Sequence, residues 1–278
     1  MSSTFDWATH SGDAWTRRWC EIEAALSDLA PRLHRALLDS APAGSFRALD
    51  VGCGAGTTSE LLALERPDAT IIGCDLSPSL VRLAQDRLAI LKAVRIVLGD
   101  AQVVAGGEGP FDLIFSRHGV MFFDDPAAAF RRLRDAMKPG GVLVFSCFQD
   151  WQANSWASEL GSAAAGRALP PPGREAGGFA FADPEYVRQI LEAAGWINAA
   201  SQPIPFGYVA GAGEGAVDQA LDFLSDVGPA SRVLNSLPAA ERPAAVKRMR
   251  LVLESHCFSE TIEFPAAAWL WSAQAPLR

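Results

Sequence analysis

The sequence predicts an α/β protein in which a mostly parallel β-sheet is covered by helices on both faces. Short apolar runs, rich in Val, Ile, Leu and Phe and without clean alternation, occur at Phe46–Val51, Thr70–Cys74, Val94–Leu98, Phe111–Phe115 and Val142–Phe148. Runs of this kind are typical of strands that are buried on both faces. Helix signals lie between these runs, and alternation of strands with helices is the pattern of a parallel sheet.

The helix signals are capping and stop residues. Thr57-Thr58-Ser59-Glu60 has the form of a capping box. Ser77-Pro78, Asp125-Pro126 and Asp183-Pro184 each provide an N-cap and a proline at the first helical position. Pro139-Gly140-Gly141 is predicted to end the helix that follows Asp125.

The flanking regions predict further elements. Residues 13–40 are expected to be helical, with Trp15 and Trp19 on the apolar face. Residues 158–178 are rich in Ala, Gly and Pro and predict an irregular insertion. Beyond it we expect a helix through Ala194, a strand near 196–205, helices around 214–227 and 238–255, and a last apolar run at 266–273.

Composition limits the class of protein. The chain has 278 residues, of which 49% are hydrophobic and 20% charged, as in folded soluble proteins and unlike disordered or collagen-like chains. The formal net charge is −8, and no cluster of Lys and Arg resembles a phosphate-binding stripe, so nucleic acid is disfavoured as a ligand.

The cysteines and the N-terminal residues favour a cytoplasmic protein. The five cysteines are widely spaced without a C-x-x-C pair, which indicates reduced thiols and no structural metal site. The first residues lack the basic and apolar regions of a signal peptide. No apolar run reaches the ~20 residues that a membrane span needs.

A glycine-rich turn follows the first predicted strand, in Asp50-Val51-Gly52-Cys53-Gly54-Ala55-Gly56. Glycine allows backbone conformations and close approaches that other residues do not. The N–H groups at the start of the next helix favour a polar or anionic group. Because ligands of open parallel sheets bind at the carboxyl ends of the strands, we expect a nucleotide-like ligand at this turn.

The residues alone leave two nucleotide-like cofactors open. A dinucleotide fingerprint needs G-x-G-x-x-G, but Thr57 occupies the third position and the glycines fall as G-x-G-x-G. Asp75, at the end of the second strand, is placed to accept two ribose hydroxyls, which either cofactor supplies. Asp100 adds a second carboxylate at the same edge. No lysine follows the glycines, as a P-loop would require.

Taken together, these segments resemble the class I S-adenosylmethionine-dependent methyltransferases, and most of all the branch with the ubiquinone and menaquinone biosynthesis methyltransferases. The matching segments lie in family order over residues 46–148: Leu49-Asp50-Val51-Gly52-Cys53-Gly54-Ala55-Gly56, Gly73-Cys74-Asp75-Leu76-Ser77, Gly99-Asp100-Ala101, Phe111-Asp112-Leu113-Ile114-Phe115-Ser116 and Lys138-Pro139-Gly140-Gly141-Val142-Leu143.

The resemblance implies one structural domain with a Rossmann-like, seven-stranded sheet, mostly parallel, whose last strand is antiparallel. It assigns residues 1–40 to an N-terminal helical lid and 41–150 to the S-adenosylmethionine-binding core. Residues 151–278 would form a variable helical insertion for substrate recognition and the last strands of the same sheet.

The resemblance also implies roles for residues of the cofactor site. The backbone at Gly52 and Gly54 would face the methionine end of S-adenosylmethionine, and Asp50 would steer its ammonium group. Asp75 would hold the ribose hydroxyls, and Leu76 would pack on the adenine. A structural role for Asp50, bonding the amides of the turn, stays open.

The remaining implied contacts lie at the adenine, the sulfonium and the lid. Asp100 would accept a hydrogen bond from the adenine amino group, and the amide of Ala101 would donate one. Ser116 would lie under the sulfonium, with its carbonyl near the methionine amine. Trp15 resembles the lid aromatic that closes over the cofactor.

Catalytic and acceptor-binding residues are less well defined. His118, in the loop after the fourth strand, is the candidate general base, although a loop histidine also often forms only local bonds. Arg117 would either orient an anionic acceptor or pair with a carboxylate. Four aromatic residues are candidates either for lining the acceptor pocket or for ordinary packing: Trp151, Trp156, Phe179 and Phe181. His256 is a second candidate base and a candidate acceptor-binding residue.

Other polar residues near the predicted site have structural alternatives. Asp124 and Asp125 have the form of an acid–base pair, but Asp125 occupies an N-cap position. Cys53 and Cys74 lie beside the site, where small buried hydrophobes are expected.

The predicted activity is methyl transfer from S-adenosylmethionine to a small organic acceptor, apolar or aromatic, by in-line displacement, with S-adenosylhomocysteine as product and no metal. Orientation and exclusion of water contribute most to such a reaction, so a base is needed only if the acceptor must lose a proton. An NAD(P)-dependent oxidoreductase and a cofactor-binding protein without methyl transfer are the alternatives. The acceptor, the methylated atom and the oligomeric state, a homodimer included, stay open.

Overall fold

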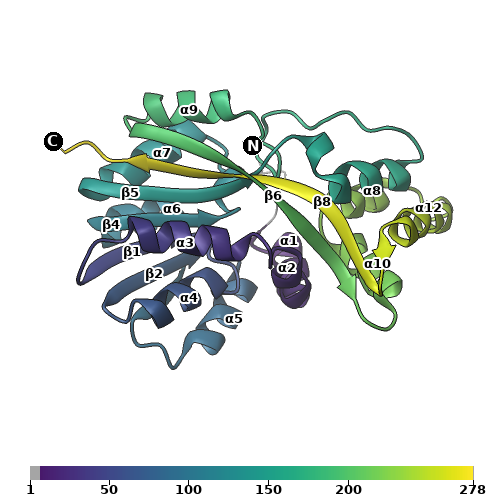
Figure 1. Ribbon diagram of the computed structural model, residues 1–278, viewed down its shortest axis with the longest axis horizontal. Helices are drawn as coiled ribbons and strands as arrows, with labels where there is room; N and C mark the ends of the chain where they lie inside the picture. Colours follow the sequence, from purple (N-terminus) through teal and green to yellow (C-terminus); the bar gives the residue numbers. More distant parts are fainter. Residues whose placement is uncertain (1–6, 278) are drawn as a thin grey trace.

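The structure is a computed structural model that describes residues 7–277, so the first six residues of the predicted lid lie outside the described part. Its central sheet has the strand order β3-β2-β1-β4-β5-β8-β6, with the short β7 paired to β8 (Figure 1). The strands are β1 (Phe46–Val51), β2 (Ala69–Asp75), β3 (Val94–Leu98), β4 (Phe111–Arg117), β5 (Met137–Phe148), β6 (Ile197–Ala212), β7 (Cys257–Phe258) and β8 (Thr261–Gln274).

The strand directions confirm the predicted fold class. Strands β1 to β5 pair in parallel, and β8 pairs antiparallel with both β5 and β6. The main path therefore contains the expected seven strands with the last strand antiparallel, and the two-residue β7 is an eighth strand in the described chain.

Helices cover both faces of the sheet, as a buried parallel sheet requires. One face packs against α3 (Ala30–Ser40) and α4 (Thr57–Glu65), and α5 (Pro78–Leu88) packs against β2 and β3. The other face packs against α6 (Ala101–Glu108), α7 (Pro126–Asp135) and α9 (Pro184–Ala193). Side chains of β4 alternate between the two clusters, with Leu113 in the first and Ile114 in the second.

The N-terminal region differs from the single helix predicted over residues 13–40. It forms α1 (His10–Arg17), α2 (Trp19–Ala25) and α3, with breaks at Arg18 and between Leu26 and Leu29. Pro31 lies in the first turn of α3, where its missing N–H costs least. Because Leu33 and Leu37 are fully buried against the sheet, residues 30–40 belong to the core layer and only α1 and α2 form the lid.

Three of the predicted caps are confirmed, and the capping box is not. Ser77, Asp125 and Asp183 each accept a backbone N–H from the first turn of α5, α7 and α9. Helix α4 instead begins after Gly56, whose φ of 83° is left-handed, and it has no side-chain cap. Its Glu60 pairs with Arg87 of α5.

Residues 139–141 were predicted to end the helix that follows Asp125. In the structure α7 already ends at Asp135, and these residues lie in β5.

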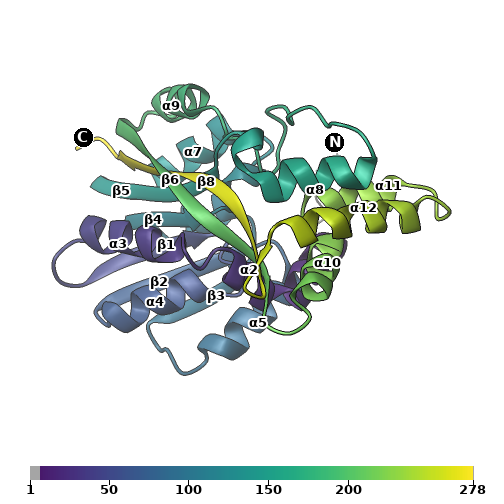
Figure 2. The same ribbon diagram turned by 45° about the vertical axis from the view of Figure 1, so that its right-hand side comes forward.

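A lobe of helices covers the far end of the antiparallel β6–β8 pair and forms the right side of Figure 1. Its helices are α8 (Ser155–Ala165), α10 (Ala216–Asp226), α11 (Pro229–Ser236) and α12 (Arg242–Ser255), which pack on one another and on these two strands (Figure 2). We call these four helices, together with the far end of the β6–β8 pair, the cap lobe. The expected irregular insertion is thus helical over its first part, and residues 166–183 contain no helix or strand.

Across residues 7–277, no helix combines the length and the apolar character needed to cross a bilayer.

Candidate active site

Two adjoining cavities lie at the carboxyl ends of the strands. The larger, of about 720 Å³, follows the ends of β1, β2 and β3, and we call it the strand-end cavity. The smaller, of about 290 Å³, lies between the lid, the sheet and the cap lobe, and we call it the cap cavity. Both are lined by Trp15, Gly52, Gly54, Arg117 and His118, so these residues stand where the two cavities meet.

The glycine turn after β1 has the backbone conformation that its sequence predicts. Gly52, Gly54 and Gly56 have φ values of 66°, 54° and 83°, in the left-handed region that favours glycine. A Cβ atom on Gly52 would lie 3.0 Å from the Cα of Gly119, so the loops after β1 and β4 touch backbone to backbone. The turn leaves its backbone open to both cavities.

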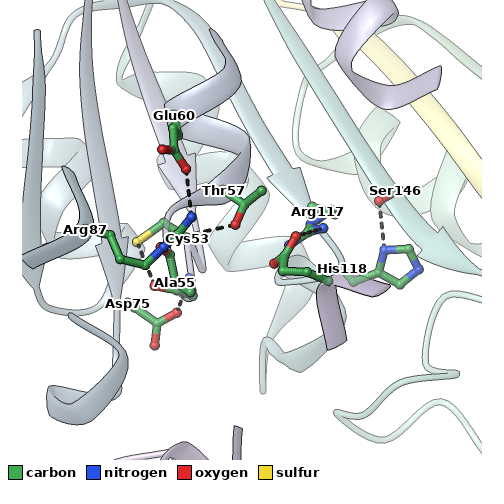
Figure 3. A network of polar contacts seen from close by, with 11 residues as sticks. Cys53, Ala55, Thr57, Glu60, Asp75, Arg87, Arg117, His118 and Ser146 are labelled. Carbon is green, nitrogen blue, oxygen red and sulfur yellow. Dashed lines mark hydrogen bonds and ion pairs between the residues drawn. The ribbon is translucent and has the colours of Figure 1, made fainter. Parts of the chain in front are cut away.

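Asp75 joins the ends of β2 and β1 and faces the strand-end cavity. One carboxylate oxygen accepts the amide of Gly54 at 2.9 Å (Figure 3). The other accepts the amide of Ser77 at 2.9 Å. Burial raises the pKa of Asp75 above its ordinary value, against the effect of these bonds. Each oxygen retains a lone pair, so the carboxylate is suited to accept the two hydroxyls of a ribose.

The next wall of the strand-end cavity suits a flat heterocycle. Leu76 is 50% exposed although it is large and apolar, and it lines the cavity. Asp100 caps α6 through a 2.7 Å bond from the amide of Gln102 to one carboxylate oxygen. Within residues 7–277, no protein donor contacts the second oxygen of Asp100, and Ala101 lines the same wall. The adenine contacts of these two residues stay a prediction.

Asp50 is buried and borders the cap cavity beside the glycine turn. Its carboxylate accepts the hydroxyl of Ser59 at 2.7 Å, rather than amides of the turn. Burial raises the pKa of Asp50 to about 7, while the Ser59 hydrogen bond and the charge of Arg117 act in the opposite direction. A cation bound next to this carboxylate would stabilise its ionised form.

The side chain of Ser116 bonds to the loops after β1 and β4 and does not reach either cavity. Its hydroxyl donates to the carbonyl of Val51 at 2.7 Å and accepts the amide of Gly119 at 3.1 Å. The side chain is fully buried and lines neither cavity, so it holds the loops after β1 and β4 together. The contact of its carbonyl with the methionine amine stays a prediction.

The lid is bonded to both the core and the cap lobe. Trp15 of α1 lines both cavities, and its ring lies 5.4 Å from that of Trp7 in an edge-to-face contact. Asp13 of α1 accepts the hydroxyl of Ser79, and Arg18 forms an ion pair with Asp226 of α10 at 2.9 Å. These contacts hold α1 and the α1–α2 junction against α5 and α10.

Arg117 is paired with a carboxylate of the lid. Its guanidinium donates to both carboxylate oxygens of Glu23, one of them at 2.8 Å. The pair is one of the two alternatives that the sequence left open. It satisfies the charge of Arg117 while both side chains line the cap cavity.

His118 has an unusual backbone conformation and a half-satisfied ring. Its φ is 62°, and its Nδ1 lies 2.8 Å from the hydroxyl of Ser146 (Figure 3). The Nε2 atom is buried without a partner among residues 7–277, and the residue lines both cavities. Burial, together with the charge of Arg117, lowers the pKa of His118 to about 3, so the imidazole is neutral.

Aromatic side chains form one wall of the cap cavity. The predicted Trp156 and Phe179 lie there with Phe148 and Tyr208. Trp156 and Tyr208 are stacked with ring centroids 4.5 Å apart and planes 5° from parallel. Tyr208 was not predicted, although the alternation of large apolar residues at Ile204, Phe206 and Tyr208 is a period-two signal in the sequence. In the structure these residues lie on the buried face of β6.

Three other predicted residues lie elsewhere. Trp151 is buried edge-to-face against Phe179 and lines neither cavity, and Phe181 belongs to the core between α7 and β5. His256 pairs with Glu159 at 2.8 Å and packs on Phe264, so it is not available as a base for either cavity. These positions correct the acceptor-binding assignments of Trp151 and His256.

The neighbouring cysteines and aspartates have the expected structural roles. Cys53 and Cys74 are buried, and burial raises the pKa of both thiols, which keeps them protonated. Asp125 caps α7 through the amide of Ala128 at 3.0 Å. Among residues 7–277, no cluster of His, Cys, Asp and Glu is suited to hold a metal ion.

The strand order of the sheet is that of the Rossmann-like methyltransferase fold. Residues 49–145 match the family described as a methyltransferase domain. The chain therefore carries a methyltransferase domain over this segment. Of the two cofactors that the residues alone left open, the match favours S-adenosylmethionine, and Asp75, Leu76 and the left-handed glycines fit that molecule.

Curated relatives resemble parts of the chain. A malonyl-[acyl-carrier protein] O-methyltransferase of Herminiimonas arsenicoxydans is 31% identical over 70% of this chain and 66% of its own length. A trans-aconitate 2-methyltransferase of Methylobacterium radiotolerans is 34% identical over 49% and 45% of the two chains. A ubiquinone biosynthesis O-methyltransferase of Cereibacter sphaeroides is 29% identical over 46% and 51%. The chain thus spans less than two thirds of the length of these relatives.

Solved structures share the fold at low identity. A putative methyltransferase from Bacillus halodurans has a TM-score of 0.57 and 16% identity, over 88% of this chain and 98% of its own. The phosphoethanolamine N-methyltransferase 2 of Haemonchus contortus, solved with S-adenosylhomocysteine, has a TM-score of 0.56 over 96% of this chain and 58% of its own.

Proposed function

We propose that this protein transfers the methyl group of S-adenosylmethionine to a small organic acceptor that binds in the cap cavity. The observation that carries this proposal is the junction of the two cavities at Gly52, Gly54, Arg117 and His118. A cofactor held along the strand ends would present its sulfonium at this junction, and an acceptor under the cap lobe would approach from the other side.

The cofactor supplies a methyl group that is already activated by the positive sulfur. The acceptor atom forms a bond to the methyl carbon as the carbon–sulfur bond breaks, and the sulfur keeps the electron pair. The residues of the chain therefore have to bind, align and exclude water. Asp75 and Leu76 would hold the nucleoside, Asp50 the ammonium group, and Trp15 would cover the site. Alignment in a closed site contributes several kcal/mol to reactions of this type, up to ~7–11 in model systems.

The walls of the cap cavity favour an apolar or aromatic acceptor. Trp156, Phe179 and Tyr208 provide flat apolar surfaces. Three of the charged side chains on its wall are already engaged, since Glu23 pairs with Arg117 and Asp226 pairs with Arg18. Binding of a carboxylate acceptor to Arg117 would first require the loss of the Glu23 pair, which is unfavourable for a partly buried arginine.

Calorimetric titration with S-adenosylhomocysteine, with NADH titrated in parallel, tests the cofactor half of the proposal. We expect binding of S-adenosylhomocysteine, and binding of NADH alone would overturn the proposal. Mass spectrometry of pooled phenols, amines and quinols incubated with S-adenosylmethionine then tests transfer. A product heavier by one CH₂ supports the activity, whereas tight cofactor binding without S-adenosylhomocysteine formation from any acceptor class would indicate a binding protein of this fold.

A further inference from the structure

His118 is joined to Ser146 of β5 at two points, and this geometry defines what its ring can do. The backbone amide of His118 donates to the carbonyl of Ser146 at 3.1 Å. The ring nitrogen Nδ1 lies 2.8 Å from the hydroxyl of the same serine. The ring also packs against Phe148, with centroids 4.2 Å apart. The side chain is therefore fixed with Nε2 directed away from Ser146, and the residue lines both cavities (Figure 3).

Hydrogen bonding at Ser146 selects the tautomer of the ring. Ser146 is fully buried, and within the described chain its hydroxyl has a single hydrogen-bond contact, with His118 Nδ1. If Nδ1 carried the proton, the hydroxyl hydrogen of Ser146 would have no acceptor, and an unpaired buried donor is costly. The favoured arrangement has Ser146 donating to Nδ1, which places the single ring proton of the neutral imidazole on Nε2.

We propose that Ser146 and His118 form a neutral dyad whose Nε2–H donates a hydrogen bond to an oxygen of the acceptor, and this inference rests on the proposed methyl transfer. The acceptor class is a flat, unsaturated ring compound that carries a carbonyl or a deprotonated hydroxyl oxygen. His118 is then an acceptor-binding residue and not the general base that its position in the loop first indicated. Ser146 is the positioning residue that sets the tautomer.

The aromatic walls of the cap cavity, which His118 also lines, agree with this class of acceptor. Phe148 and Phe179 line the cap cavity with a ring separation of 5.7 Å, and the parallel Trp156–Tyr208 stack continues the same wall. Flat walls of this kind select flat molecules. Because Nε2 is buried and without a partner, an acceptor that lacks a suitable oxygen would leave this donor unsatisfied. The dyad therefore discriminates between ring compounds by their oxygen.

The lowered pKa of His118 is consistent with a donor role. A neutral imidazole whose pKa is about 3 takes up a proton from a phenol very unfavourably. A hydroxyl acceptor would lose its proton to solvent before it is enclosed, and the acceptor oxygen would enter as the oxyanion that Nε2–H binds.

Nitrogen-15 NMR of the histidine side chains tests the tautomer without any acceptor or turnover. The chain has only four histidines, so a His118→Gln variant assigns the signals of this ring. We expect Nδ1 to be the unprotonated nitrogen and to carry the shift caused by a hydrogen-bond donor. Ser146→Ala should remove that shift and Ser146→Thr should retain it. A protonated Nδ1 in the wild-type protein would overturn the proposal.

Binding of flat probes to the protein saturated with S-adenosylhomocysteine tests the acceptor class. The probes are 1,4-naphthoquinone for a carbonyl oxygen, ionised 4-nitrophenol for an oxyanion, and naphthalene as the ring without oxygen. Replacement of His118 by Phe should lower the affinity for an oxygen-bearing probe on the order of tenfold and leave the affinity for naphthalene unchanged. If both oxygen-bearing probes bound the wild type and the variant with equal affinity, the dyad would be contradicted. Failure of S-adenosylhomocysteine to bind would contradict the proposed function instead.

Discussion

Glu23 of the lid and Arg117 at the end of β4 form a two-point ion pair that closes α2 onto the sheet. The two side chains are 20% and 12% exposed, so most of their surface is withdrawn from water. Because both residues line the cap cavity, the pair is at once a wall of the proposed acceptor site and a contact that holds the lid shut.

Replacement of Glu23 by Gln should lower the free energy of unfolding by about 1–3 kcal/mol, since Arg117 would stay largely buried without a charged partner. Urea denaturation measures this change. Glu185→Gln is the matched control, because it breaks a pair with Arg188 whose side chains are 55% and 44% exposed. An exposed pair contributes about 0–1 kcal/mol, so equal effects of the two substitutions would show that the lid contact has no special role.

Asp75→Ala should weaken binding of S-adenosylhomocysteine by about 1.5–3 kcal/mol, because a charged acceptor of hydrogen bonds from the ribose is lost. Some stability should be lost as well, since the amides of Gly54 and Ser77 both donate to this carboxylate. Calorimetry on folded variants measures the affinity. Asp86→Asn removes a charge from the exposed face of α5 and should leave the affinity unchanged. Unaltered binding in Asp75→Ala would place the ribose elsewhere.

Gly119→Ala should destabilise the protein by about 1–3 kcal/mol, because overpacking at a rigid backbone contact forces atoms to move. The added Cβ would lie 2.6 Å from the carbonyl oxygen of Val51 and 2.9 Å from the hydroxyl of Ser116. Gly106→Ala in α6 is the control, since nothing lies within 4 Å of its added Cβ. Alanine should stabilise that helix by roughly 0.5–1 kcal/mol. Thermal unfolding of the two variants should therefore move in opposite directions.

Asp50 and His118 should give opposite contributions to the pH dependence of stability. The pKa of Asp50 is raised to about 7 from an ordinary 3.8, so the native state keeps a proton that the unfolded chain has lost, and stability increases as pH falls through this range. The pKa of His118 is lowered to about 3 from 6.5, so the unfolded chain gains a proton that the native state does not, and stability decreases as pH falls.

The two contributions oppose each other over their shared range, each with a slope of at most about 1.4 kcal/mol per pH unit. Asp50→Asn should leave the His118 effect and make the protein lose stability more steeply on acidification. His118→Gln should leave only the Asp50 effect, so that this variant gains stability on acidification, the opposite of Asp50→Asn. Urea titrations of the wild type and both variants at several pH values measure the slopes, and identical slopes in all three proteins would disprove the assignment.

Binding of S-adenosylhomocysteine should release a proton from Asp50 if the ammonium group of the ligand lies next to this carboxylate. The positive charge favours the ionised carboxyl and lowers its pKa from the value of about 7 in the free protein. Calorimetry just below neutral pH, in two buffers that differ in ionisation enthalpy, counts the released protons. The release should disappear in Asp50→Asn, and release that persists in this variant would assign it to another group.

Much of the core could be predicted from local sequence. The predicted strands Phe46–Val51 and Val94–Leu98 have the same bounds in the structure, and Ser77, Asp125 and Asp183 cap helices as expected. Each of these features depends on the identity of neighbouring residues. The position of Gly52, Asp75 and Asp100 on one cavity could also be predicted, because the carboxyl ends of parallel strands lie at one edge of the sheet.

The local predictions that were wrong concern competition between neighbouring signals. Thr57-Thr58-Ser59-Glu60 has the letters of a capping box, but the left-handed Gly56 precedes it and Glu60 turns to Arg87. Likewise, the apolar pattern of residues 13–40 is continuous and does not indicate where the helix breaks. The breaks allow α1 and α2 to lie over the cavities while α3 packs on the sheet. A helical period does not show which surface each turn will meet.

The sequence by itself therefore determined the fold class, the glycine turn and the carboxylates along the strand ends, since these arise from short-range patterns and from the geometry of parallel strands. Only the tertiary structure decided that Arg117 binds Glu23, 94 residues away, and that His118 binds Ser146, 28 residues away. It also placed Tyr208 on the wall of the cap cavity and His256 away from it. Contacts between distant segments depend on the packing of the lid and the cap lobe, which no local pattern specifies.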